Sequence, residues 1–123
     1  IQDRGISSSL AYQPLQDKKI SINLLSKLPG NQLALQYRPD YLVILEVDPT
    51  KAAQRLGERA DKQDDAIFEK INFQKKLAEK FKTKSYKKIF TKNKTNLYYL
   101  PADTKIDIMK AESIKLFKNI INI

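Results

Sequence analysis

The four arginines have the most specific chemistry that residue types alone reveal in this chain. Nineteen of the 23 basic residues are lysine, and the others are Arg4, Arg38, Arg55 and Arg59. The planar guanidinium group binds phosphate through two parallel hydrogen bonds, whereas a lysine ammonium acts as a point charge. We therefore treat the arginines as the most informative cations in the sequence.

The residue types that are missing exclude several kinds of active site. The 123 residues include no histidine and no cysteine. Zinc sites built on these residues, disulfide frameworks, Ser-His-Asp triads and thiol nucleophiles are therefore excluded. The glycines Gly5, Gly30 and Gly57 cannot make either G-x-x-x-x-G-K-[ST] or G-x-G-x-x-G, the usual phosphate-binding loops. A chain without cysteine fits a reducing cytosol, so we expect a cytoplasmic protein.

The net charge of +9 is concentrated in the second half of the chain. Residues 62–123 carry +8, and residues 82–94 contain six lysines and no acidic residue. One interpretation of this run is a patch for a polyanion, and the favoured one is a solvated surface. The scarcity of arginine, and the lack of interleaved aromatic and basic residues, argue against nucleic acid as a partner. No apolar run approaches 18 residues, so we expect no membrane span.

The elements that must position these residues alternate between helices and strands. Residues 10–35 are mostly helical in composition, interrupted at Pro14 and Pro29. Residues 41–47 form a nearly continuous apolar run, which is typical of a parallel strand covered on both faces. A second strand is predicted over residues 95–100.

Three helices are predicted around these strands. Asp48-Pro49 is a good start for a helix over residues 49–57. A second helix over residues 66–82 has one apolar stripe, formed by Ile67, Ile71, Leu77, Ala78 and Phe81. The capping-box pattern Thr104-Lys105-Ile106-Asp107 opens the last helix. Its apolar residues share one face: Ile106, Met109, Ile114, Phe117, Ile120 and Ile121.

This alternation predicts an α/β fold that is part of a three-layer α/β/α parallel sheet. The expected elements are two strands, a strand stub at Ile1-Gln2 and about five helices. A length of 123 residues limits the chain to one domain or part of one. Because an apolar strand such as 41–47 needs neighbours on both edges, we expect the remaining strands in a segment upstream of Ile1.

Near its start, the chain contains the run Asp3-Arg4-Gly5-Ile6-Ser7-Ser8-Ser9-Leu10-Ala11-Tyr12-Gln13. This run resembles the signature of thymidylate kinases, which is Asp-Arg-(Tyr/His) followed by Ser-Ser-x-Ala-Tyr-Gln. Later segments also resemble the family: Arg38-Pro39-Asp40, Val47-Asp48-Pro49, Asn72-Phe73-Gln74 and Leu100-Pro101-Ala102-Asp103. The resemblance covers essentially all 123 residues.

The resemblance implies the C-terminal part of a single P-loop nucleoside-monophosphate kinase domain. Residues 1–13 would be its substrate-site motif, residues 54–66 its lid, and residues 95–103 a strand and the adenine loop. The phosphate loop would lie in an N-terminal segment outside this chain. We therefore expect the chain alone to be inactive, and its partners to be that segment and the substrates. A homodimer is left open.

The resemblance also implies a role for individual residues. Arg4 would bind the acceptor phosphate of thymidine monophosphate, and Asp3 would lie close to the magnesium ion and the phosphates. Ser9 and Gln13 would hydrogen-bond the edge of the thymine, while Tyr12 would lie against the sugar. The implied catalytic residues are Asp3, Arg4, Arg55 and Arg59. The implied ATP-binding residues are Arg59, Pro101 and Ala102.

The implied reaction is phosphoryl transfer from ATP, with Mg²⁺, to thymidine monophosphate, giving thymidine diphosphate and ADP. Three departures from the family pattern leave an alternative, a truncated and non-catalytic remnant of such a kinase. Asp65 stands where the lid commonly has an arginine, so Arg55, Arg59 or Lys62 would have to replace it. Gly5 replaces the usual Tyr or His, and Pro14 replaces a Gly.

Overall fold

The computed structural model describes residues 1–57 and 65–122, and all their side chains except those of residues 55–57 and 65–68. The elements in chain order are α1 (Ile6–Gln16), α2 (Ile22–Lys27), α3 (Pro29–Gln36), β1 (Tyr41–Glu46), α4 (Pro49–Gly57), α5 (Asp65–Phe81), α6 (Lys84–Lys92), β2 (Asn96–Pro101) and α7 (Ile106–Ile121). These described ranges hold seven helices, where the sequence predicted about five. None of them is long and apolar enough to cross a membrane.

The two strands form a parallel sheet, as the apolar runs predicted. Tyr41 is opposite Asn96, and the register continues without interruption to Glu46 and Pro101. Beyond this register, the N–H of Ala102 donates to the carbonyl of Glu46 at 2.7 Å. The side chain of Thr95, which is 3% exposed, donates to the carbonyl of Pro39 at 2.8 Å. Both ends of the sheet are therefore fixed by hydrogen bonds.

The strand stub expected at Ile1-Gln2 is not present. These two residues have no strand structure, and the sheet of the described residues contains β1 and β2 alone. Ile1 is fully exposed to solvent. A strand at this position needs a neighbour that accepts and donates its backbone hydrogen bonds, and no described strand lies beside it.

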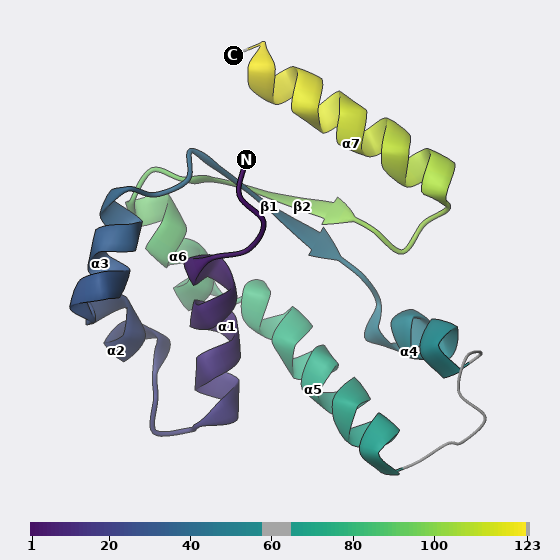
Figure 1. Ribbon diagram of the computed structural model, residues 1–123, viewed down its shortest axis with the longest axis horizontal. Coiled ribbons are helices and arrows are strands. Elements are labelled where there is room, and N and C mark those ends of the chain that lie inside the picture. Colours follow the sequence, from purple (N-terminus) through teal and green to yellow (C-terminus); the bar gives the residue numbers. More distant parts are fainter. Residues whose placement is uncertain (58–64, 123) are drawn as a thin grey trace.

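The helices lie on both faces of the sheet, which gives the predicted three layers. Figure 1 shows α7 on one side of β1 and β2, with α1, α5 and α6 on the other. The core lies on the second side. It contains the buried residues Leu10, Ile44, Leu77, Tyr86 and Phe90, with Leu42, Leu97 and Tyr99 packed against them.

The face of the sheet toward α7 is only partly covered, which corrects the expectation of a strand covered on both faces. The side chains of Val43 and Leu45 are 37% and 56% exposed. The last helix also leaves part of its predicted apolar face in solvent: Ile106, Ile114, Phe117 and Ile121 are exposed, and no residue of α7 is buried. Helix α7 packs against β2 and leaves this face of β1 partly in solvent.

Two predicted helix signals differ from the structure. The cap residue of α7 is Lys105, without a side-chain hydrogen bond, so the Thr104 capping box does not form. Pro14 lies inside α1, which continues to Gln16 rather than stopping at the proline. Pro29 behaves as expected, because it ends α2 and occupies the first turn of α3.

Two tyrosines make stability depend on alkaline pH. Burial, and to a smaller extent Tyr99, raises the pKa of Tyr86; burial and then Glu46 raise the pKa of Tyr99. The unfolded chain loses these protons near the ordinary pKa of 10.0, whereas the folded chain keeps them. The stabilisation is therefore fully present below pH 10 and is lost as the pH rises through the folded-state values.

We expect the urea concentration at the midpoint of unfolding, measured by circular dichroism at a series of pH values, to fall as the pH rises from about 10 to about 11. Tyr86→Phe removes the more strongly shifted group and should reduce this slope. A slope that is the same in Tyr86→Phe and in the parent chain would assign the pH effect to other groups, such as the lysines.

Candidate functional site

The bend that contains Asp3 and Arg4 has an unusual backbone. Arg4 has φ 64° and Gly5 has φ 150°, both in the region that side chains rarely adopt. Such strain in a residue other than glycine is concentrated at functional sites. Both Asp3 and Arg4 are exposed, and no ion pair involves Arg4 among the residues that the structure describes. The guanidinium group is therefore available to an anionic ligand.

Helix α1 separates its core residues from its candidate ligand-binding residues. Leu10 and Ala11 are fully buried, whereas Gln13 is exposed and Ser9 is half-buried. Residues four apart lie above one another on a helix, so Ser9 and Gln13 share one face. Burial of Leu10 and Ala11 fixes the rotation of α1 and therefore the direction of this face. Ser9 lies five residues after Arg4.

Tyr12 connects α1 to the helix that follows the lid segment. Its ring lies 5.7 Å from the ring of Phe73 in α5, with 45° between the ring planes. Helices α1 and α5 also pack against each other. Tyr12 therefore has a packing role in this structure, and a contact with a sugar would use only the part of its ring that Phe73 leaves free.

The lid residues can be placed only in part. Arg55 belongs to α4, and its side chain is outside the described residues. Arg59 and Lys62 also lie outside the described residues. Asp65, which replaces the lid arginine in the resemblance, is the first residue of α5.

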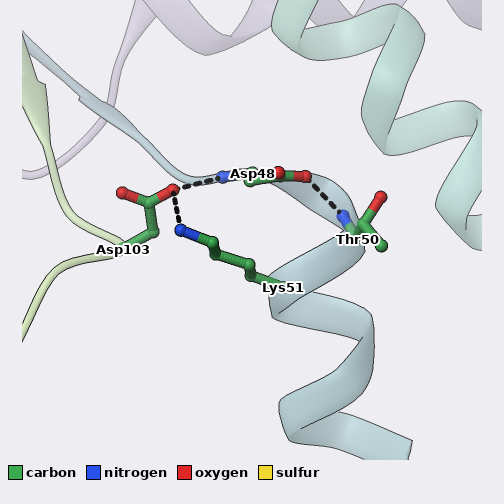
Figure 2. Close-up of polar contacts among 4 residues, drawn as sticks. All are labelled: Asp48, Thr50, Lys51 and Asp103. Carbon is green, nitrogen blue, oxygen red and sulfur yellow. Dashed lines mark hydrogen bonds and ion pairs between the residues drawn. The ribbon is translucent and has the colours of Figure 1, made fainter.

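The carboxyl ends of the two strands are joined by polar contacts that sequence reasoning did not predict. A carboxylate oxygen of Asp103 accepts from the N–H of Asp48 at 3.3 Å and lies 3.8 Å from the Nζ of Lys51. Asp48 in turn accepts from the N–H of Thr50 at 2.9 Å and so caps α4, as expected (Figure 2). The available signal was an aspartate just after each predicted strand.

These contacts place the proposed adenine loop beside the start of α4. Pro101 is exposed at the end of β2, and Ala102 is half-buried and bonded to Glu46. A cavity of about 1140 Å³ borders this end of the sheet. Its walls include Asp48, Pro101 and Asp103, together with Phe73 and Leu77 of α5. Phe73 therefore links the cavity to Tyr12 of α1.

A metal site is not formed by the described residues alone. They contain no group of three acidic side chains that could hold an ion. Magnesium usually takes one or two carboxylates and completes its coordination with substrate phosphates and water. Asp3, next to Arg4, fits such a role, because a single exposed carboxylate suffices when phosphates supply the other ligands.

The basic run over residues 82–94 is partly engaged within the fold. Lys82 makes an ion pair with Glu46, with its Nζ 2.8 Å from the carboxylate, and the Nζ of Lys87 lies 5.3 Å from the ring centre of Tyr99. Lys84 and Lys88, one turn apart on α6, are exposed. Two of the lysines thus have a structural explanation that requires no polyanion.

The fold defines an α/β protein with a cavity at the carboxyl ends of its parallel strands, the usual ligand position in such folds. The family model described as thymidylate kinase matches residues 1–112. The chain therefore belongs to the thymidylate kinase family, and the resemblance of the Asp3–Gln13 motif is confirmed at that level.

A curated relative supports the same family. A protein named "Probable thymidylate kinase", from Methanococcus vannielii, is 36% identical over 85 residues. The alignment covers 66% of this chain and 36% of the relative. The chain thus spans little more than a third of the length of that relative. No solved structure matches the chain.

Proposed function

We propose that this chain supplies the nucleotide-base helix and the lid of a thymidylate kinase, which transfers a phosphoryl group from ATP to thymidine monophosphate. A phosphate oxygen of thymidine monophosphate bonds to the γ-phosphorus, and the bond to the oxygen that bridges the β- and γ-phosphates breaks. The products are thymidine diphosphate and ADP. Such a transfer requires positioning and charge neutralisation rather than a covalent nucleophile.

The observation that best supports this proposal is the arrangement of Arg4, Ser9 and Gln13. An exposed guanidinium with no ion-pair partner among the described residues suits a doubly charged phosphate. The shared face of Ser9 and Gln13 offers hydroxyl and amide groups to a pyrimidine edge. Asp3 would hold Mg²⁺ together with the phosphates, and the ion would neutralise charge on the transferring group.

The cradle for the β- and γ-phosphates must come from outside this chain. Its three glycines cannot form the loop whose backbone N–H groups surround these phosphates. We propose that another segment of the complete protein, or a second chain, provides that loop. Pro101 and Ala102 would then contact the adenine at the end of β2.

Removing the amide of Gln13 tests the base-binding role. In the complete protein, Gln13→Ala should raise the Michaelis constant for thymidine monophosphate by about 5- to 150-fold and leave that for ATP unchanged. This corresponds to about 1–3 kcal/mol, the usual cost of a polar group left without its partner. Steady-state kinetics with each substrate varied in turn provide the measurement.

Gln16→Ala is the matched control, because it removes the same side chain from an exposed position one turn further along α1. It should change neither constant. Equal increases for both substrates in Gln13→Ala, or the same increase in Gln16→Ala, would contradict the base-binding role of Gln13.

The alternative is a non-catalytic remnant that retains the fold of the family. The observation that favours it is Asp65, because an acidic side chain at the lid position would repel the transferring phosphates. The mass of the intact protein separates the two proposals. A mass well above 14.2 kDa supports the enzyme, since a longer chain has room for the phosphate loop.

A further inference from the structure

The first turn of α1 lacks the local support that helices usually have. Its cap residue is Gly5, and no side chain caps the free N–H groups of the first turn. Arg4 has the unfavourable left-handed φ described above, whereas Gly5 tolerates its positive φ because it has no side chain. The bend gains one backbone hydrogen bond of its own, from the N–H of Ser8 to the carbonyl of Gly5 at 3.1 Å. A strained bend of this kind persists only where the surrounding structure holds it.

Tyr86 of α6 provides such a hold. Its hydroxyl donates to the carbonyl of Ser7 at 2.9 Å, a contact between residues 79 positions apart. Among the residues that the structure describes, this is the one hydrogen bond that joins the backbone of α1 to a distant element. Ser7 is three residues after Arg4 and two before Ser9, so the bond holds the first turn of α1 between these two residues.

The side chain of Tyr86 is itself fixed. It is 0% exposed, and its ring contacts Phe81 edge-on at 5.3 Å and Phe90 at 5.2 Å. Burial raises the pKa of the hydroxyl, which therefore remains a donor throughout the range in which enzymes work. The Tyr86 hydroxyl is therefore a rigid donor in the core, and its bond to Ser7 fixes the position of the first turn of α1.

We propose that Tyr86 is a positioning residue of the nucleotide site: its hydroxyl fixes the first turn of α1 and thereby the positions of Arg4 and Ser9. Tyr86 touches no substrate. It acts through the carbonyl of Ser7, and its effect falls on the acceptor nucleotide rather than on ATP. This inference rests on the proposed function, because Arg4 and Ser9 must bind a ligand for their positions to matter.

Tyr86→Phe tests the proposal in the complete protein, because it removes the hydroxyl and retains the ring that packs in the core. The Michaelis constant for thymidine monophosphate should rise about tenfold, as expected for one lost hydrogen bond, while that for ATP changes less than twofold. Hydrogen exchange of the amides in residues 7–10 should become faster.

Thr95→Val is the matched control. Thr95 is also a buried residue whose hydroxyl donates to a distant backbone carbonyl, that of Pro39, at the amino ends of the strands. It should leave both Michaelis constants and the exchange in residues 7–10 unchanged. A selective effect of Tyr86→Phe, absent from Thr95→Val, supports the proposal.

Four results would overturn it. Equal increases for both substrates, or the same increase in Thr95→Val, would show that the hydroxyl of Tyr86 only stabilises the fold. Unchanged exchange in residues 7–10 would show that it does not hold the first turn. Failure of the unsubstituted protein to bind thymidine monophosphate would refute both the proposed function and the positioning role. The exchange measurement would still show whether the hydroxyl of Tyr86 stabilises the first turn of α1.

Discussion

Arg4→Ala in the complete protein should lower kcat/KM for thymidine monophosphate by about 100- to 1000-fold. The guanidinium group would neutralise charge on the acceptor phosphate, and losing one such group typically costs about 3–4 kcal/mol of transition-state stabilisation. Arg4 is exposed and has no ion-pair partner among the described residues, so the change breaks no internal contact that the structure shows. Thermal unfolding should therefore be unchanged.

Two further variants define the role of Arg4. Arg4→Lys keeps the charge and removes the planar fork, so it should recover only part of the lost rate. Lys105→Ala removes an exposed cation at the start of α7 and should leave kcat/KM unaltered. Full activity in Arg4→Ala, or equal losses in Arg4→Ala and Lys105→Ala, would exclude phosphate binding by Arg4.

The 123-residue chain expressed alone should self-associate rather than form a stable monomer. The edge of β1 away from β2 has no strand partner among the described residues, and unpaired strand edges promote association. Val43 and Leu45 of the same strand are exposed, as is Phe117 of α7. Size-exclusion chromatography with light scattering should report oligomers or aggregates at micromolar concentration.

Charges on the exposed apolar face should increase the monomer fraction. We expect the double variant Leu45→Lys and Phe117→Lys to elute mainly as a monomer. Gln36→Lys adds a lysine at an exposed polar position in α3 and should behave like the parent chain. A parent chain that is monomeric, with one sharp two-state thermal transition, would show that two strands and these helices form a self-sufficient domain.

Much of the fold follows from patterns that are local in the sequence. The apolar runs predicted both strands to within one residue, and the Asp48-Pro49 pair predicted the start of α4. The stripe of Leu77 and Phe81 placed α5 against the core. These signals succeed because strand composition, helix periodicity and capping act between residues that are close in the chain. The Asp3–Gln13 motif indicated the family for the same reason.

The local patterns failed where the outcome depends on what lies nearby in space. The capping-box spacing at Thr104 is present in the sequence, yet α7 begins one residue later without it. The apolar composition of β1 predicted two covered faces, but coverage requires neighbours that composition cannot supply. Ile1-Gln2 has strand-like residues, but a strand forms only beside a partner.

The sequence by itself determined the family and the two strands, and it pointed to Arg4, Ser9 and Gln13 as candidates for binding a phosphate and a pyrimidine base. Only the tertiary structure decided how those residues are held. The contact from Tyr86 to Ser7 joins residues 79 positions apart, and that from Asp48 to Asp103 joins residues 55 apart. No periodicity or cap signal encodes such pairs, because they form only when packing of the core brings their elements together.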